Sequence, residues 1–180
     1  METKQVGKLT LRTFDILQNN TLSDVDNDIG TISANGQFIT WKNVNMRLVL
    51  GDIYDKYNKF NIRLVGYSHR PPTTALTTTN NVLFYLSGTF SFAFGSYNHA
   101  TRSIRNETCI GGSILRTASV GSNNTFFQID TTILKQREYE TFTIEYKNSS
   151  TQVISGLSEK INQMIGHSTF ILEFVGVDEN

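Results

Sequence analysis

Residues 44–64 read VNMRLVLGDIYDKYNKFNIRL, and two patterns in this stretch decide the fold class. Apolar side chains occupy alternate positions before Gly51 and again from Phe60 onward, at Val44, Met46, Leu48, Leu50, Phe60, Ile62 and Leu64. Because successive side chains of a β-strand point to opposite faces, this alternation predicts two strands. Between them, residues 51–59 are expected to form one or two helical turns.

The same alternation recurs along the rest of the chain. Asn35-Gly36, between Ile32 and Phe38, is a strong hairpin signal, and the continuous apolar run 82–86 predicts a strand buried on both faces. Further strands are predicted over 8–11, 109–115, 125–133, 140–146 and 169–177, with an aromatic stripe at Phe90, Phe92 and Phe94. About eight or nine strands with irregular loops predict an all-β chain, a single jelly-roll-type antiparallel β-sandwich.

Length and composition agree with one such domain over residues 1–180, because compact domains hold about 100–200 residues. A second short helix is predicted over 153–165, where apolar residues follow helical spacing. The predicted core contains Trp41, Phe60, Ile62, Leu64, Phe84, Phe92, Phe142 and Phe174. Polar loops are expected over 70–81 and 97–107, and these are the expected regions of contact with neighbouring molecules.

Net charge, the N-terminal residues and the cysteine content indicate which partners and which cellular compartment to expect. Lys and Arg number 16 and Asp and Glu number 16, so the chain lacks the basic excess that direct nucleic-acid binding would favour. The N-terminal residues have no apolar signal core, and no stretch reaches membrane-spanning length. The single cysteine, Cys109, has no partner for an internal disulfide. Together these features predict a chain made in a reducing cytoplasm, with no membrane span.

No residue pattern indicates an enzyme, a cofactor or a metal. The histidines at 69, 99 and 167 are far apart in the sequence, and Cys109 begins an apolar strand without a neighbouring base. Residues 111–113 lack the G-x-S-x-G pattern of a nucleophile elbow. Asp52 and Asp55 could form a carboxylate pair, but local capping and ion pairing in a helical turn explain them more simply. We therefore predict no catalytic, cofactor-binding or metal-binding residues.

The segment from Leu48 to Leu64 resembles a stretch of a known family. It is similar to the strand–G-[DN]-x-Y-[DE]-K-Y-x-K-F–strand segment of single-jelly-roll minor capsid and penton proteins from icosahedral DNA viruses of protists, which include virophages and their large-virus relatives. The matching residues are Gly51, Asp52, Tyr54, Asp55, Lys56, Tyr57, Lys59 and Phe60. The resemblance implies a structural protein of the virion, made in the host cytoplasm, that contacts a major capsid protein and forms a ring, with a pentamer favoured over a trimer.

Each matching residue also has an expected structural role. Gly51 permits a sharp turn, Asp52 can cap the following helical turn, and Tyr54 and Tyr57 share one side of it. Lys56 and Lys59 are expected to face solvent or a neighbouring subunit. A lectin-like or receptor-binding β-sandwich remains the alternative, with residues 97–99 as a candidate sugar-binding tip.

Overall fold

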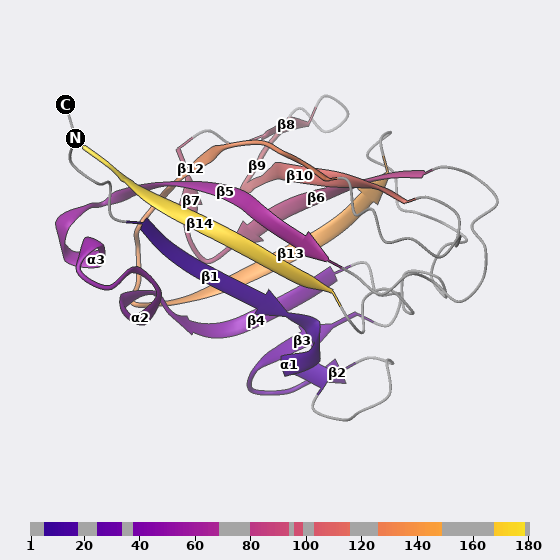
Figure 1. The fold of residues 1–180 in the computed structure, drawn as a ribbon, viewed down its shortest axis with the longest axis horizontal. Coiled ribbons are helices and arrows are strands. Elements are labelled where there is room, and N and C mark those ends of the chain that lie inside the picture. The colour runs from indigo at the N-terminus through magenta and orange to yellow at the C-terminus, as the bar shows by residue number, and fades with distance from the viewer. Residues whose placement is uncertain are drawn as a thin grey trace.

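The computed structural model contains two antiparallel sheets packed face to face (Figure 1). It describes residues 6–17, 25–33, 38–68, 80–93, 96–98, 103–115, 126–148 and 168–178. The first sheet has the order β1 (Val6–Arg12), β14 (Thr169–Val177), β5 (Lys59–Ser68), β12 (Thr131–Leu134) and β7 (Ser91–Phe92). The second has the order β11 (Phe126–Gln128), β10 (Glu107–Leu115), β6 (Asn80–Gly88), β13 (Tyr139–Asn148), β4 (Phe38–Asn45), β3 (Gly30–Ile32) and β2 (Val25–Asp26).

The strand order identifies the sandwich as a jelly roll. Among the described elements, the longer strands are β1, β4, β5, β6, β10, β12, β13 and β14. When these eight are numbered in chain order, they pair as 1-8-3-6 in one sheet and 2-7-4-5 in the other. Chain neighbours therefore lie mostly in opposite sheets, which is the double Greek-key arrangement of a jelly roll. The predicted fold class is confirmed.

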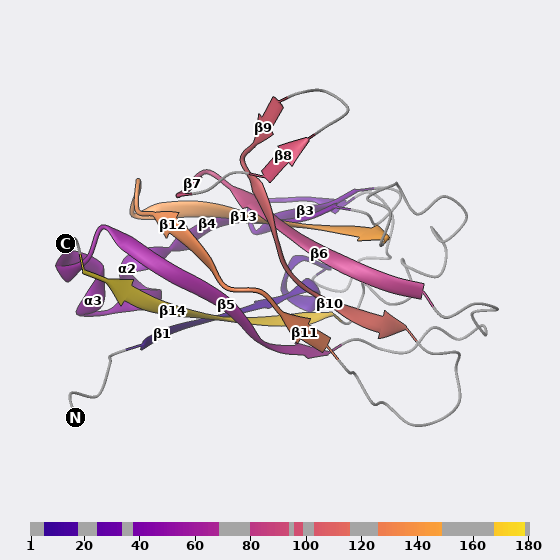
Figure 2. The same ribbon diagram turned by 90° about the horizontal axis from the view of Figure 1, so that it is seen from above.

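Among the residues that the structure describes, three short helices connect or flank the strands: α1 (Thr13–Leu17), α2 (Met46–Leu50) and α3 (Ile53–Lys56). None of the helices in the described ranges has the length and apolar character needed to cross a membrane. A separate hairpin of β8 (Ser96–Asn98) and β9 (Ser103–Arg105) projects away from the two large sheets (Figure 2). The described part of the chain is thus dominated by strands, as the alternation predicts.

The two long sides of the sandwich are closed in different ways. On one side the chain leaves β11 in the second sheet and enters β12 in the first, and Ile129 N–H donates to Ile110 C=O at 3.0 Å at this switch. On the other side, β1 is the edge of the first sheet, and Thr13 N–H extends its pairing with β14 by donating to Ser168 C=O at 3.0 Å. Trp41 of β4 spans the two sheets there, since its Nε1–H donates to Arg12 C=O at 3.0 Å.

The core between the sheets is rich in aromatic rings. Phe84 of β6 lies at the centre of one cluster, with ring-centroid distances of 4.4 Å to Tyr67, 5.2 Å to Phe170 and 5.5 Å to Tyr146. The Tyr146 hydroxyl is bonded to Ser168 Oγ at 3.1 Å, which satisfies a polar group inside the core. All eight predicted core residues are buried: Trp41, Phe60, Ile62, Leu64, Phe84, Phe92, Phe142 and Phe174.

The alternation before Gly51 was wrongly interpreted as strand throughout. Strand β4 ends at Asn45, and residues 46–50 form the helix α2. Met46 and Leu50 are buried one helical turn apart, whereas Leu48 is 82% exposed. The alternation misled because residues four apart share a face in a helix and in a strand alike. The helical turn predicted within 51–59 is confirmed as α3.

Three other features of the structure also differ from the sequence-based prediction. The strand expected over 125–133 is divided into β11 and β12, because the chain changes sheets at Ile129 and Asp130. The run 82–86 is buried on one face only, since Leu83 and Tyr85 are half-buried on the outer face. The loop expected over 97–107 contains β8, β9 and the start of β10.

Several expectations fall outside the described residues. They are the helix over 153–165, the Asn35-Gly36 turn, Phe94, most of the loop 70–81 and the three histidines. Strands β3 and β4, which flank that turn, do pair antiparallel, with Ile32 opposite Ile39.

Candidate functional site

The segment that carries the family resemblance connects the two sheets. The chain leaves the second sheet at β4, passes through α2 and α3, and enters the first sheet at β5. Both helices lie together at one end of the sandwich, at the left in Figure 1. We call the surface formed here the α2–α3 corner, and define it by Arg47, Leu48, Tyr54, Asp55, Glu138 and Tyr139.

Local sequence signals explain why the chain turns at these positions. Asn45 caps α2, because its side-chain oxygen accepts a hydrogen bond from Leu48 N–H at 3.0 Å. Gly51 ends α2 with a φ of 56°, a backbone conformation that residues other than glycine rarely adopt. A β-carbon at Gly51 would meet nothing within 4 Å, so backbone conformation, and not space, is the reason for glycine. The expected role of Gly51 is confirmed.

The expected role of Asp52 is wrong. Asp52 precedes α3 but its side chain makes no capping hydrogen bond, because its backbone is already helical, with a φ of −61° and a ψ of −23°. A capping side chain is favoured by extended backbone at that position. The turn is closed instead by the backbone bond from Tyr54 N–H to Gly51 C=O at 3.0 Å.

Arg47 organises the charged part of the corner. Its Nη1 donates to Asp55 Oδ2 at 2.6 Å, and its Nε lies 3.9 Å from Glu138 Oε2. The same guanidinium lies over the Tyr54 ring at 4.8 Å from the centroid. The bond to Asp55 raises the pKa of Arg47, so the side chain remains a cation. Arg47 thereby joins α2, α3 and the start of β13.

Tyr54 is buried beneath this network and is contacted from two sides. Lys135 Nζ lies over the ring at 4.4 Å from its centroid and also donates to the Tyr54 carbonyl. Burial raises the pKa of the Tyr54 hydroxyl. A tyrosine between two cations is a structural anchor, because cation–π contacts hold it in one orientation.

Tyr57 has a second anchoring role. A β-carbon on Gly176 of β14 would lie 2.3 Å from Tyr57 Cδ2, so the ring occupies the space that only a glycine leaves free. Tyr57 also contacts Phe60 edge-on at 6.4 Å between centroids. Lys56 is exposed and lies over the Tyr57 ring at 5.2 Å, whereas Lys59 is half-buried. The two tyrosines of the motif therefore fix the corner to the core and to β14.

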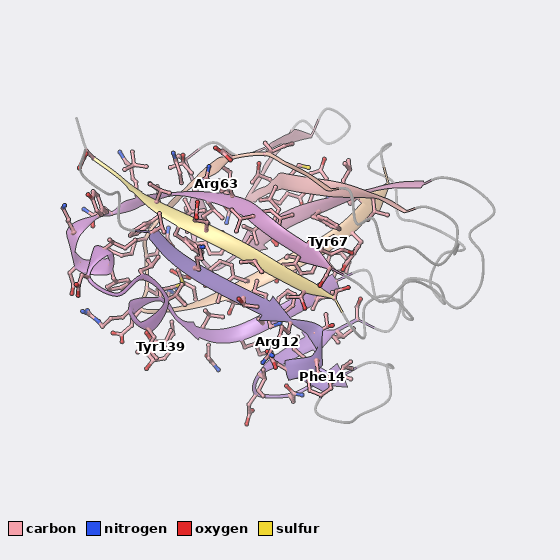
Figure 3. The ribbon with its side chains drawn as sticks, viewed as in Figure 1. Arg12, Phe14, Arg63, Tyr67 and Tyr139 are labelled. Carbon is pink, nitrogen blue, oxygen red and sulfur yellow. The ribbon has the colours of Figure 1, made fainter. Side chains whose placement is uncertain are left out.

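Two apolar side chains of the corner remain in solvent. Leu48 is 82% exposed on α2, and Tyr139 is 57% exposed at the start of β13. They are neighbours through Asn45, which pairs with Tyr139 in the sheet and caps Leu48. Figure 3 shows the Tyr139 side chain beside α2, pointing away from the sandwich. The corner thus presents apolar groups on a support that hydrogen bonds and ion pairs hold in place.

This arrangement favours binding over acid–base chemistry. Asp55 is held by Arg47 at hydrogen-bond distance, and Asp52 is exposed. A catalytic carboxylate pair would instead need two carboxylates that share one site and differ in pKa. Within the residues that the structure describes, no group of three His, Cys, Asp or Glu side chains converges to hold a metal ion.

A second charged cluster lies on the outer face of the second sheet. Lys147 of β13 has 6% of its side chain exposed and is bonded to Glu107 at 2.9 Å and Glu145 at 3.0 Å. Its ammonium also lies 4.3 Å from the centroid of the Tyr85 ring. Burial lowers the pKa of Lys147, but the bonds to the two carboxylates outweigh this effect, so the pKa is raised overall. A lysine nucleophile is favoured by a lowered pKa, which the two carboxylates oppose here.

Cys109 borders that cluster and is half-buried, with Sγ 3.4 Å from Gly111 C=O. Burial raises the pKa of its thiol, which opposes the thiolate that a nucleophile requires. Asn106 is also engaged, since its side chain donates to Phe90 C=O at 2.8 Å and accepts from Phe92 N–H at 3.2 Å. These contacts assign both residues structural roles.

Sequence reasoning identified two of the six residues that define the α2–α3 corner. Tyr54 and Asp55 belong to the resembling motif, whereas Arg47, Leu48, Glu138 and Tyr139 were not singled out as site residues. Arg47 and Leu48 were hidden by the strand interpretation. Tyr139 of β13 and the preceding Glu138 reach the corner through the pairing of β13 with β4. No protein-family model and no curated protein sequence matches the chain.

Proposed function

We propose that the chain is a structural subunit of a viral capsid, a penton or minor capsid protein that assembles through the sides of its jelly roll. Its partners in this role are further copies of the chain and a major capsid protein. A pentamer at a capsid vertex is favoured over a trimer at a pseudo-hexagonal position. The proposal begins from the resemblance of residues 48–64 to that family, and three structural features support it.

The carrying observation is the composition of the α2–α3 corner. Leu48 and Tyr139 are exposed by 82% and 57%. Arg47 precedes Leu48 on α2 and lies 3.9 Å from Glu138, the residue before Tyr139. Tyrosine and arginine are enriched at protein–protein interfaces, where a few anchoring side chains provide most of the binding energy. The bond from Arg47 to Asp55 and the cap from Asn45 hold the backbone of α2 that carries Leu48, so little backbone entropy is lost on association.

The position of the corner, beside the edge strand β1, leaves both sheet faces free. It lies at the end of the sandwich where β4 leaves one sheet and β5 enters the other, and α2 contacts β1 there. A cyclic ring needs two different and complementary surfaces on each subunit. A rigid corner provides one such surface without using the sheet faces.

The balanced charge is the third support. With 16 basic and 16 acidic residues, neighbouring copies carry no net like-charge repulsion. The carboxylates and cations of the corner already pair within the chain, which leaves the apolar groups as the contact-forming part.

Two substitutions test whether the corner is the subunit contact. Leu48→Ser and Tyr139→Ser are expected to shift the mass from light scattering toward the monomer, while the melting temperature stays within a few degrees because both side chains are exposed. Phe38→Ser is the matched control, since Phe38 is 41% exposed at the opposite end of β4. Unchanged assembly in both corner variants, or equal loss in the control, contradicts the proposed contact. In that case a receptor-binding or lectin-like module becomes the better explanation.

A further inference from the structure

Strand β1 differs from the other sheet edges in the described part of the chain. The two sheets end at β1, β7, β11 and β2. The last three contain 2, 3 and 2 residues, whereas β1 contains 7. Proteins commonly shorten edge strands because an edge presents unpaired backbone groups that can pair with another chain. Of these four edge strands, β1 is therefore the one long enough to pair with another chain over several residues.

The hydrogen-bonding register shows which β1 groups point outward. Thr13 N–H donates to Ser168 C=O, and Leu11, Leu9 and Gly7 follow at alternate positions opposite Phe170, Leu172 and Phe174. In an antiparallel pair, hydrogen-bonded and non-bonded positions alternate. The backbone groups of Leu9 and Leu11 therefore point to β14. Those of Lys8 and Thr10 point away from it, toward the open edge.

The open span has defined ends. At one end, α2 packs against Gly7, where a β-carbon would lie 2.7 Å from Leu50 Cδ2. At the other end, Arg12 C=O accepts the bond from Trp41. Between these ends, the described part of the structure shows no hydrogen bond to the outward backbone groups of Lys8 or Thr10. Both side chains are exposed.

The charges beside this edge select one kind of partner. The residues of β1 are VGKLTLR, so its exposed charges are Lys8 and Arg12, and it contains no carboxylate. Arg12 is bonded to Asp15 at 2.8 Å. The carboxylate across from Lys8, that of Glu173, is bonded to Arg63 at 2.5 Å. Lys8 therefore keeps a charge that neighbouring acids do not neutralise by direct contact.

We propose that β1 is a strand-addition site for an extended segment of another polypeptide that carries acidic side chains at alternate positions. The incoming backbone would bond to Lys8 and Thr10, and an acidic side chain would lie opposite Lys8. A second copy of β1 fits less well, because β1 has no carboxylate to place opposite Lys8 in any register. Backbone bonds supply the affinity and alternate side chains supply the selectivity in this binding mode. The inference does not depend on the capsid role.

A synthetic peptide that alternates glutamate and valine tests the site by amide hydrogen exchange and NMR shifts. Its binding is expected to protect the amides of Lys8 and Thr10, with little change at Leu9, whose amide already bonds to β14. The same peptide with its backbone amides N-methylated lacks the donors and should not bind. Lys8→Glu is expected to weaken glutamate-peptide binding about three- to tenfold at low salt.

Thr10→Pro separates the site from the stability of the fold. The Thr10 amide is outside the β1–β14 ladder, so the variant should keep its melting temperature within a few degrees and lose peptide binding. Thr10→Val is the matched control, because it retains the amide and should retain binding. Equal binding to Thr10→Pro overturns the proposal, as does protection of both amides in the dilute, peptide-free protein. Protection that instead rises with protein concentration alone identifies a second copy as the occupant, and also overturns it.

Discussion

Removal of the Phe84 ring is expected to cause one of the largest losses of stability available in this chain. Phe84 is fully buried and contacts Tyr67, Phe170 and Tyr146 at centroid distances of 4.4, 5.2 and 5.5 Å. Phe→Ala changes in cores cost about 3–5 kcal/mol. We place Phe84→Ala near the upper end, about 4–5 kcal/mol, because favourable aromatic pairs add about 0.5–1.5 kcal/mol each beyond burial.

The assay is urea unfolding, with stability taken from the midpoint and slope of the transition. Two other Phe→Ala variants calibrate the effect of burial. Phe92 is 8% exposed on the short strand β7 and, within the described residues, contacts one aromatic ring, that of Phe90 at 5.4 Å, so we expect a loss of about 3 kcal/mol. Phe14 is 57% exposed, and its replacement should cost less than about 1 kcal/mol. Equal losses at Phe84 and Phe14 would refute the inward orientation of β6, and an unchanged Phe92→Ala would refute that of β7.

Three further predictions follow from particular contacts. Gly51→Ala should reduce stability by about 1–2 kcal/mol, because φ is 56° at this position. Asp52→Ala should change stability little, since Asp52 makes no capping hydrogen bond. Equal effects of the two substitutions would contradict this assignment of roles. Gly176→Ala should displace the Tyr57 ring and so reduce stability. In the double variant with Tyr57→Ala, the loss should be smaller than the sum of the two single losses. Additive losses would show that the ring and Gly176 are independent. Burial raises the pKa of Tyr146 to about 12 from an ordinary value of 10.0, so the folded state favours the neutral phenol. The contribution of Tyr146 to stability should therefore be constant below pH 10 and fall as the pH rises from about 10 to 12. Stability should fall less over this range in Tyr146→Phe. An identical pH profile in that variant would show that Tyr146 is not the cause.

The core was predictable because burial in a sandwich follows the simplest property of a strand. Phe60, Ile62 and Leu64 alternate in the sequence, and all three are buried on β5. The final strand was also predicted with its observed limits, since Thr169–Val177 is a continuous β-branched and aromatic run. In these segments local pattern and tertiary packing favour the same structure.

The corner was less predictable because long-range contacts and a short cap define it. Met46 and Leu50 fit a strand and a helix equally well, and the deciding bond is the one from Asn45 to Leu48. Glu138 and Tyr139 are distant in sequence and are brought to α2 by the pairing of β13 with β4. The outer cluster around Lys147 was missed for a related reason: alternation indicates that Lys147 faces outward, but not that carboxylates and the Tyr85 ring bury it there.

The proposed capsid role is tested most directly by the mass of the purified chain over a wide concentration range, combined with negative-stain images. A vertex subunit is expected to give a particle of five times the chain mass of 20.3 kDa, independent of concentration, with rings of five-fold symmetry in the images. A three-fold ring of three chains would retain the capsid role at a pseudo-hexagonal position. A strict monomer at every concentration, which also fails to bind capsid partners, would contradict the account.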